Sequence, residues 1–221
     1  MCGRYTIAKP KRIIAAFEPV TVKAGLDHPR YNIAPMQKVP VVRGARGARV
    51  LEDCQWGFIP SWAKDQADGS RMINARAETV AAKPAFRAAF LKTRCLIPAD
   101  GFYEWQETES GKQPVYIHPA DDEPFVFAGL YSAWTGAGPG TMLLSCTIVT
   151  KDADEFMAPI HRRMPVILPQ EAWDAWTDPA NADAAGLLRI LAGAHGRQLT
   201  RLNVSKVVNS PANDDERCIR P

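Results

Sequence analysis

The sequence of 221 residues predicts a single α+β domain, residues 1–221, with a mixed, mostly antiparallel sheet and peripheral helices. Hydrophobic residues make up 46% of the chain, which is enough for one substantial core. Short runs rich in β-branched and aromatic residues alternate with Gly, Pro and Asp, as strands and turns do. No linker or internal repeat divides the chain, so one domain is expected.

The segments with a strand pattern are short and are separated by turn residues. They are 39–42, 49–56, 94–98, 102–106, 115–118, 125–131, 142–150 and 164–168. Glu109-Ser110-Gly111-Lys112 lies between two of them and predicts a hairpin turn with antiparallel pairing.

Helices are expected at the edges of this sheet. Ile13, Ile14 and Phe17 have near-helical spacing and predict a short helix early in the chain. Pro84 favours the first turn of a helix over 84–91. Apolar faces predict two more helices, over 169–177 and 183–192.

The charge balance permits an anionic partner without requiring one. The formal net charge is only +3, but Arg outnumbers Lys 17 to 10. Guanidinium groups suit bidentate recognition of phosphate, although a genomic bias in composition would give the same excess. The positions of the arginines must therefore decide.

Cysteine and histidine positions argue against disulfides and metals. The cysteines, at 2, 54, 95, 146 and 218, are odd in number and scattered, and the histidines, at 28, 118, 161 and 195, show no ligand spacing. We expect no metal and no cofactor. No segment resembles a signal peptide or a membrane span, so we expect a cytoplasmic protein that is associated with the nucleoid when bound to DNA. We also expect a monomer.

Cys2 is the first candidate for chemistry. Removal of Met1 would leave an exposed α-amine and a thiol on one residue. The amine, with an ordinary pKa near 7.7 to 8.0, can attack an aldehyde, and the thiol can then add to the imine to close a thiazolidine ring. A Cys in second position also occurs incidentally, but Gly3 and Arg4 beside it favour close approach of an anionic substrate.

Glu104 and His161 are candidates for proton transfer. Strand alternation places Glu104 among Phe102, Tyr103 and Trp105, where partial desolvation would raise the pKa of its carboxyl. The alternative is a strand residue that faces solvent. His161 has two arginines after it that would favour a neutral imidazole, although a lone His often has a structural role.

Asn74 begins Asn74-Ala75-Arg76-Ala77-Glu78-Thr79, a pattern that favours a helix cap followed by a helix. Its amide is also suited to orienting an amine or a phosphate. Among the tryptophans, Trp62 and Trp105 are the two expected to be exposed, where they would stack on bases.

Six motifs, in order along the chain, resemble the SRAP domain, the SOS-response-associated peptidase family of abasic-site processing proteins. They are Cys2-Gly3-Arg4, Tyr31-Asn32-Ile33-Ala34-Pro35, Trp56-Gly57-Phe58-Ile59-Pro60, Asn74-Ala75-Arg76-Ala77-Glu78, Gly101-Phe102-Tyr103-Glu104-Trp105 and His161 to Pro165. The resemblance continues to about Asn209.

The resemblance implies an open β-barrel, a groove for single-stranded DNA, and a covalent thiazolidine link between mature Cys2 and an abasic-site sugar. It implies that Asn74 orients the amine and the sugar, that Glu104 shuttles protons, and that His161 assists proton transfer. It also implies that removal of Met1 is the minimal peptidase reaction. The DNA contacts that it implies are Arg4, Asn32, Pro35, Trp62, Arg76, Trp105, Thr150 and Arg163.

Other functions remain open on the residues alone. An amidotransferase with an N-terminal Cys also begins Met-Cys-Gly, but its oxyanion hole needs an Asn-Gly pair, which this sequence lacks. A protease that uses Cys2, His161 and Asn74 is a second alternative. A non-covalent reader of single-stranded or modified DNA is a third.

Overall fold

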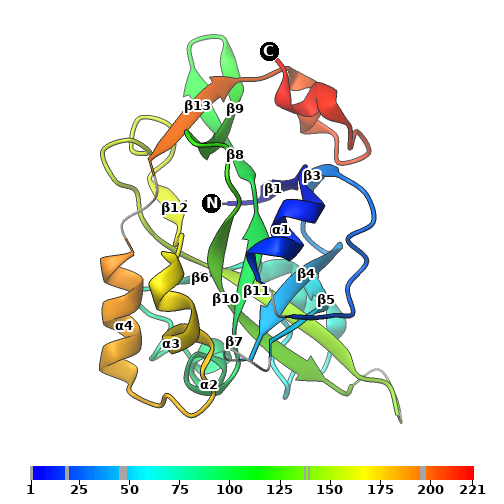
Figure 1. The fold of residues 1–221 in the computed structure, drawn as a ribbon, viewed down its shortest axis with the longest axis vertical. Coiled ribbons are helices and arrows are strands. Elements are labelled where there is room, and N and C mark those ends of the chain that lie inside the picture. The colour runs from blue at the N-terminus through cyan, green and yellow to red at the C-terminus, as the bar shows by residue number, and fades with distance from the viewer. Residues whose placement is uncertain (1, 18–19, 45–48, 137, 139, 195–197) are drawn as a thin grey trace.

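The computed structural model describes residues 2–17, 20–44, 49–136, 138, 140–194 and 198–221 (Figure 1). Its strands are β1 (Arg4–Ile7), β2 (Thr21–Val22), β3 (Arg30–Ile33), β4 (Lys38–Arg43), β5 (Val50–Trp56), β6 (Asn74–Arg76), β7 (Arg94–Ala99), β8 (Gly101–Thr108), β9 (Gly111–Pro119), β10 (Phe125–Trp134), β11 (Leu143–Asp152), β12 (Arg163–Pro165) and β13 (Leu199–Asn203). Its helices are α1 (Pro10–Ala16), α2 (Pro84–Lys92), α3 (Trp173–Thr177) and α4 (Ala184–Gly193), with 3₁₀ turns η1 (Gln66–Arg71), η2 (Gln170–Ala172), η3 (Lys206–Asn209) and η4 (Glu216–Ile219).

A β-barrel forms the centre of the molecule. In the described part of the chain, β11, β10, β7, β4 and β5 pair antiparallel in that order. A short parallel contact between β5 and β11 closes the ring, with Ser145 opposite Gln55 and Cys146 opposite Trp56. The strands are rich in Val, Ile and Leu whose side chains pack inside, because a closed sheet has a fully enclosed inner face. The predicted α+β fold with a barrel-like core is confirmed, but the barrel is closed by this β5–β11 contact and is not open as expected.

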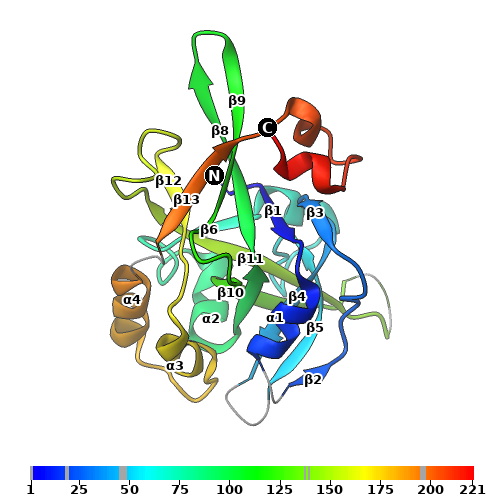
Figure 2. The same ribbon diagram turned by 45° about the horizontal axis from the view of Figure 1, so that its top comes forward.

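A second sheet lies beside the barrel, with strand order β13-β9-β8-β1-β3. Its β8–β9 hairpin projects from the body of the molecule (Figure 2). Thr108 pairs with Gly111, and Gly111 has φ +102°, a left-handed conformation that favours glycine. The hairpin turn expected at residues 109–112 is therefore confirmed. Ile7, Phe102 and Ile117 of this sheet join the largest hydrophobic cluster, which also contains the barrel interior.

The helices lie close to where the apolar spacing predicts them. Pro84 occupies the first turn of α2, where its missing N–H costs nothing, and Phe86 and Phe90 are buried beneath it. The predicted helix over 169–177 is divided into η2 and α3. Figures 1 and 2 show α3 and α4 side by side.

Two sequence predictions of local structure are wrong. Asn74 does not cap a helix, because 74–76 form β6, which runs parallel to β11 with Asn74 opposite Ile148. Buried Ala75 and this pairing override the capping pattern, and the next helix begins only at Pro84. The expected strand over 164–168 is also shorter, since regular pairing as β12 ends at Pro165.

Candidate functional site

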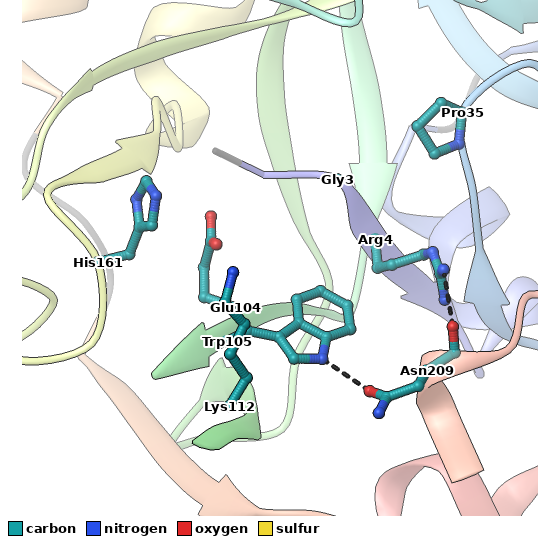
Figure 3. Close-up of a pocket in the computed structure, with 8 residues that line it drawn as sticks. All are labelled: Gly3, Arg4, Pro35, Glu104, Trp105, Lys112, His161 and Asn209. Carbon is teal, nitrogen blue, oxygen red and sulfur yellow. Dashed lines mark hydrogen bonds between the residues drawn. The ribbon is translucent and has the colours of Figure 1, made fainter. Parts of the chain in front are cut away.

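The pairing of β1 with β8 brings the start of the chain beside Glu104. Arg4 lies opposite Tyr103 and Tyr5 opposite Phe102 in this antiparallel ladder. Gly3 and Glu104 consequently line one cavity of about 620 Å³, together with Arg4, Pro35, Trp105, Lys112, His161 and Asn209. Figure 3 shows Glu104 between His161 and Trp105, with Arg4 and Asn209 on the far side of the indole. Residues from distant parts of the sequence therefore meet at one hollow.

Cys2 is buried, with 0% of its surface exposed, so the expectation of an exposed nucleophile is wrong. Its side chain belongs to the central hydrophobic cluster. Burial raises the pKa of the Cys2 thiol, and the charge of Glu104 raises it further. The thiol is thus protonated at neutral pH and is a weak nucleophile. This suits it to the later ring closure on an imine better than to the first attack on an aldehyde. Met1, whose removal the sequence led us to expect, lies outside the described residues.

Glu104 is a buried carboxyl, only 3% exposed, on the part of β8 that borders the cavity. Burial raises the pKa of Glu104, and the nearby His161 acts in the opposite direction. The expectation of a desolvated carboxyl among aromatic residues is met, because Tyr103 is buried and Trp105 half-buried on either side. A raised pKa makes a carboxyl a better proton acceptor when ionised and keeps it protonated to a higher pH than an exposed carboxyl.

His161 lies across the cavity from Glu104, at the end of the turn that precedes β12. The backbone N–H of Arg163 donates a hydrogen bond to His161 Nδ1 at 3.0 Å. The backbone N–H of His161 itself donates to the carbonyl of Met157 at 3.0 Å. The imidazole is thus held by the main chain of Arg163, and the backbone of His161 is held by the carbonyl of Met157.

Arg4 and Trp105 form one wall of the cavity, supported by the C-terminal segment. The guanidinium of Arg4 lies 5.7 Å from the Trp105 ring centroid, and its Nη1 donates to Asn32 Oδ1 at 2.7 Å and to the carbonyl of Val208 at 2.8 Å. Burial lowers the pKa of Arg4. Trp105 Nε1 donates to Asn209 Oδ1 at 2.7 Å. Trp105 is half-buried rather than fully exposed.

Asn32 is a support residue in this structure. It is fully buried, and its Nδ2 donates to the carbonyls of Val208, Ser210 and Asn213. Asn209 and Lys112, which also line the cavity, were missed as site residues by sequence reasoning. Asn209 ends the stretch that resembles the SRAP domain, which is the sequence signal that could have found it. Lys112 was named only as part of the predicted hairpin turn.

Asn74 and Arg76 border a second cavity, of about 590 Å³, with Arg71, Thr79 and Lys83. Arg76 is exposed, and the described lining of this cavity contains three basic side chains and no acidic one. Asn74 Nδ2 donates to the carbonyl of Ile73, whereas its buried Oδ1 has no hydrogen-bond partner within the described ranges. This cavity is suited to an anion. Arg71 and Lys83 were not predicted.

Thr150 and Arg163 lie beneath the surface. Thr150 is fully buried, and Arg163 is 8% exposed. Arg163 pairs with Glu78 and Asp152, both at less than 3 Å. Burial acts to lower the pKa of Arg163, but its hydrogen bonds with Glu78 and Asp152 outweigh this and raise it. The four N–H groups on Nη1 and Nη2 are directed at protein acceptors.

Trp62 is 68% exposed, as expected, and borders a third, apolar hollow of about 280 Å³ with Pro84 and Tyr131. Pro35 lines the first cavity. Across the part of the chain with described coordinates, no cluster of three or more His, Cys, Asp or Glu side chains is placed to hold a metal ion. Nor does any described helix have the length and apolarity needed to cross a membrane.

The sequence as a whole identifies the family. The family model described as SOS response associated peptidase (SRAP) matches residues 1–211. The chain belongs to the SRAP family. It is 38% identical over 228 residues to the abasic site processing protein YoqW of Bacillus subtilis, covering 99% of both chains. It is 34% identical to the abasic site processing protein HMCES of Gallus gallus, covering 92% of this chain and 69% of that one.

Solved structures have the same fold as this SRAP chain. A Bacteroides thetaiotaomicron protein superposes over 100% of both chains with a TM-score of 0.84 at 24% identity, which bears on the fold alone. A phage-related protein from Bordetella bronchiseptica has a TM-score of 0.72 and 32% identity over 92% of this chain and 94% of that one. The SRAP arrangement of barrel and second sheet is therefore shared with experimentally determined structures.

Proposed function

We propose that this SRAP protein processes abasic sites in single-stranded DNA by joining the abasic sugar covalently to Cys2 after Met1 is removed. One observation carries the proposal: Gly3, the residue after Cys2, shares a cavity with a buried carboxyl, Glu104, and an imidazole, His161. The names of the relatives YoqW and HMCES support abasic sites as the target.

The proposed reaction joins one aldehyde and one aminothiol and releases one water. The α-amine of Cys2 adds to the C1′ aldehyde of the opened sugar to give a carbinolamine, whose hydroxyl leaves as water to form an imine. The Sγ of Cys2 then adds to the imine carbon while its proton passes to the nitrogen, which closes a thiazolidine. No oxidant or cofactor is needed.

Proton transfers in this sequence would fall to Glu104, with His161 assisting. The sugar ring must open, and the carbinolamine oxygen must be protonated before it leaves. The raised pKa of Glu104 favours its protonated form, which can donate to the departing hydroxyl and then take the proton from the thiol. Asn74 would orient the amine and the sugar through its amide.

Single-stranded DNA would lie over cationic and aromatic side chains, of which Arg76 and Trp62 are exposed and Arg4, Trp105 and Pro35 are half-buried. Arg4 and Arg76 would contact phosphates, and Trp62, Trp105 and Pro35 would contact bases and sugars. Asn32, Thr150 and Arg163 are engaged in contacts within the protein, so we propose that they support this groove from beneath. The protein would act as a cytoplasmic monomer.

The peptidase in the family description would correspond, at its smallest, to the removal of Met1, by this chain itself or by an aminopeptidase. Both routes give the same mature amine. Mass measurement of the purified protein, from wild type and from Glu104→Ala, distinguishes them: retention of Met1 only in the variant would indicate self-processing.

The test of the proposed function is a denaturing gel of protein mixed with abasic single-stranded DNA. We expect a heat-stable band with wild type, none with intact DNA, and none with Cys2→Ala, although Cys2→Ala keeps most of its non-covalent affinity because phosphate contacts supply it. An N-terminal extension that blocks the amine should also abolish the band. Full crosslinking by Cys2→Ala would exclude the thiazolidine, and absence of any band with wild type would favour a non-covalent reader.

A further inference from the structure

Arg163 links its own strand, β12, to β11 and to the turn after β6, on the side of the cavity where His161 lies. Its Nη1 and Nη2 donate to the two carboxylate oxygens of Glu78 at 2.8 and 2.9 Å. Nη2 also donates to the carbonyl of Thr150 at 2.8 Å, and Nη1 donates to Asp152 Oδ1 at 2.6 Å. A planar guanidinium with two such bonds to one carboxylate fixes both distance and orientation.

Glu78 connects this guanidinium to the strand that carries Asn74 and Arg76. It lies in the turn directly after β6, whose Arg76 is opposite Thr150 of β11. The carbonyl of Thr150 accepts from the backbone N–H of Ala77 at 2.8 Å as well as from Arg163. The turn after β6, the strand β11 and the strand β12 therefore meet at one side chain.

The main chain of Arg163 connects this ion pair to the first cavity. Its N–H donates to His161 Nδ1, so a movement of Arg163 would move the imidazole. His161 in turn faces the cavity that Glu104 lines, as Figure 3 shows. The chain of contacts from Glu78 to His161 runs through a single residue.

We propose that Glu78 is a positioning residue for the reaction, because its bidentate ion pair with Arg163 sets the place of His161 in the cavity. The inference rests on the proposed function. Glu78 is not among the described residues that line the first cavity, and its ion pair is with Arg163, so it acts through Arg163. Its side chain is 44% exposed, and the guanidinium of Arg163 keeps its bonds to Asp152 and to the Thr150 carbonyl when Glu78 is removed, so global stability does not depend on Glu78 alone. Glu78 therefore affects the position of His161 in the cavity and not the stability of the fold.

Loss of Glu78 leaves Arg163 with Asp152 and the Thr150 carbonyl, so the fold should persist. We expect Glu78→Ala to slow formation of the covalent product at saturating DNA by about 10-fold to 10²-fold, the scale of a small misplacement of a catalytic group. Affinity for undamaged single strands should be unchanged or tighter, since a negative charge is removed near Arg76. Glu78→Gln should restore part of the rate through its amide oxygen.

Asp152→Ala is the matched control, because Asp152 bonds to the same guanidinium but is 84% exposed and lies on β11, not after β6. We expect its rate to stay within about 2-fold of wild type. In a His161→Ala background, Glu78→Ala should have no further effect, since the group that it positions is gone.

The outcomes separate the two proposals. If wild type forms no covalent product, the proposed function fails. If wild type reacts and Glu78→Ala reacts equally fast, or if the Glu78 and His161 effects multiply independently, the positioning role is wrong. An equal loss in the Asp152→Ala control would also overturn it, because Arg163 itself, and not its link to β6, would then matter.

Discussion

The guanidinium of Arg4 lies over the indole of Trp105, 5.7 Å from the ring centroid. The indole Nε1 donates a hydrogen bond to Asn209 Oδ1 at 2.7 Å. Trp105 also lines the cavity beside Glu104. An aromatic ring fixed at its edge and on one face is a rigid platform for stacking, because little side-chain freedom remains to be lost on binding.

Trp105→Ala should weaken binding of undamaged single-stranded DNA by about 5-fold or more, the worth of one stacked base. The dependence of affinity on salt should stay the same, because no phosphate contact is lost. Fluorescence anisotropy at several salt concentrations measures both. Asn209→Ala should have a smaller effect of the same kind, and a changed salt slope in either variant would contradict a stacking role.

Glu104→Gln should fold and bind single-stranded DNA normally but form the covalent product about 10²-fold more slowly, since an amide cannot shuttle protons. Quenched-flow or gel time courses at saturating DNA give the rate. A wild-type rate would remove Glu104 from the catalytic group.

The same substitution has a predicted effect on stability. The pKa of Glu104 is raised in the folded protein, so the folded state binds this proton more tightly than the unfolded state. Wild type therefore loses stability as pH rises from the ordinary Glu range through the raised pKa, and Glu104→Gln does not. We expect thermal unfolding of Glu104→Gln to occur at an equal or higher temperature at pH 7.5, and this gain to shrink at pH 4. A gain that is independent of pH would show that ionisation is not its cause.

Arg76→Ala should lower affinity for all single-stranded sequences by a similar factor and reduce the salt slope by about 0.7 for one lost phosphate contact. Arg76 is exposed in a cavity whose described lining is basic. Arg163→Ala should instead lower the unfolding temperature, because β11 and the turn after β6 lose their side-chain link to β12. If Arg163→Ala changes the salt slope without changing stability, the sequence-based assignment of Arg163 to a phosphate is correct.

Trp62→Ala should leave the unfolding temperature within about 2 °C of wild type, since a surface side chain contributes little to stability. Affinity for single-stranded DNA should fall, by about 1 kcal/mol if one base stacks on this ring. Differential scanning fluorimetry and a binding titration test the two statements. Unchanged affinity would place Trp62 outside the DNA path.

Sequence patterns were sufficient for the long elements. Pro84 with the apolar spacing of Phe86 and Phe90 predicted α2, and alternating or continuous apolar runs predicted the barrel strands, because these segments bury a face whatever their partners are. The three-residue strand β6 was mistaken for a helix start. So short a strand is specified by its pairing with β11, which no local pattern contains.

The types of the site residues were also readable from the sequence: Cys2 with its potential amine, Glu104 among aromatic residues, and His161 before two arginines. Their assembly was decided by tertiary structure, since the pairing of β1 with β8 brings Gly3 to Glu104. Tertiary packing also decided which of the site side chains are buried. Arg76 and Arg163 look alike in sequence, yet Arg76 is exposed and Arg163 is buried and paired with Glu78 and Asp152. An arginine bonds to the acceptors that lie nearest to it, and only the folded chain determines which acceptors those are.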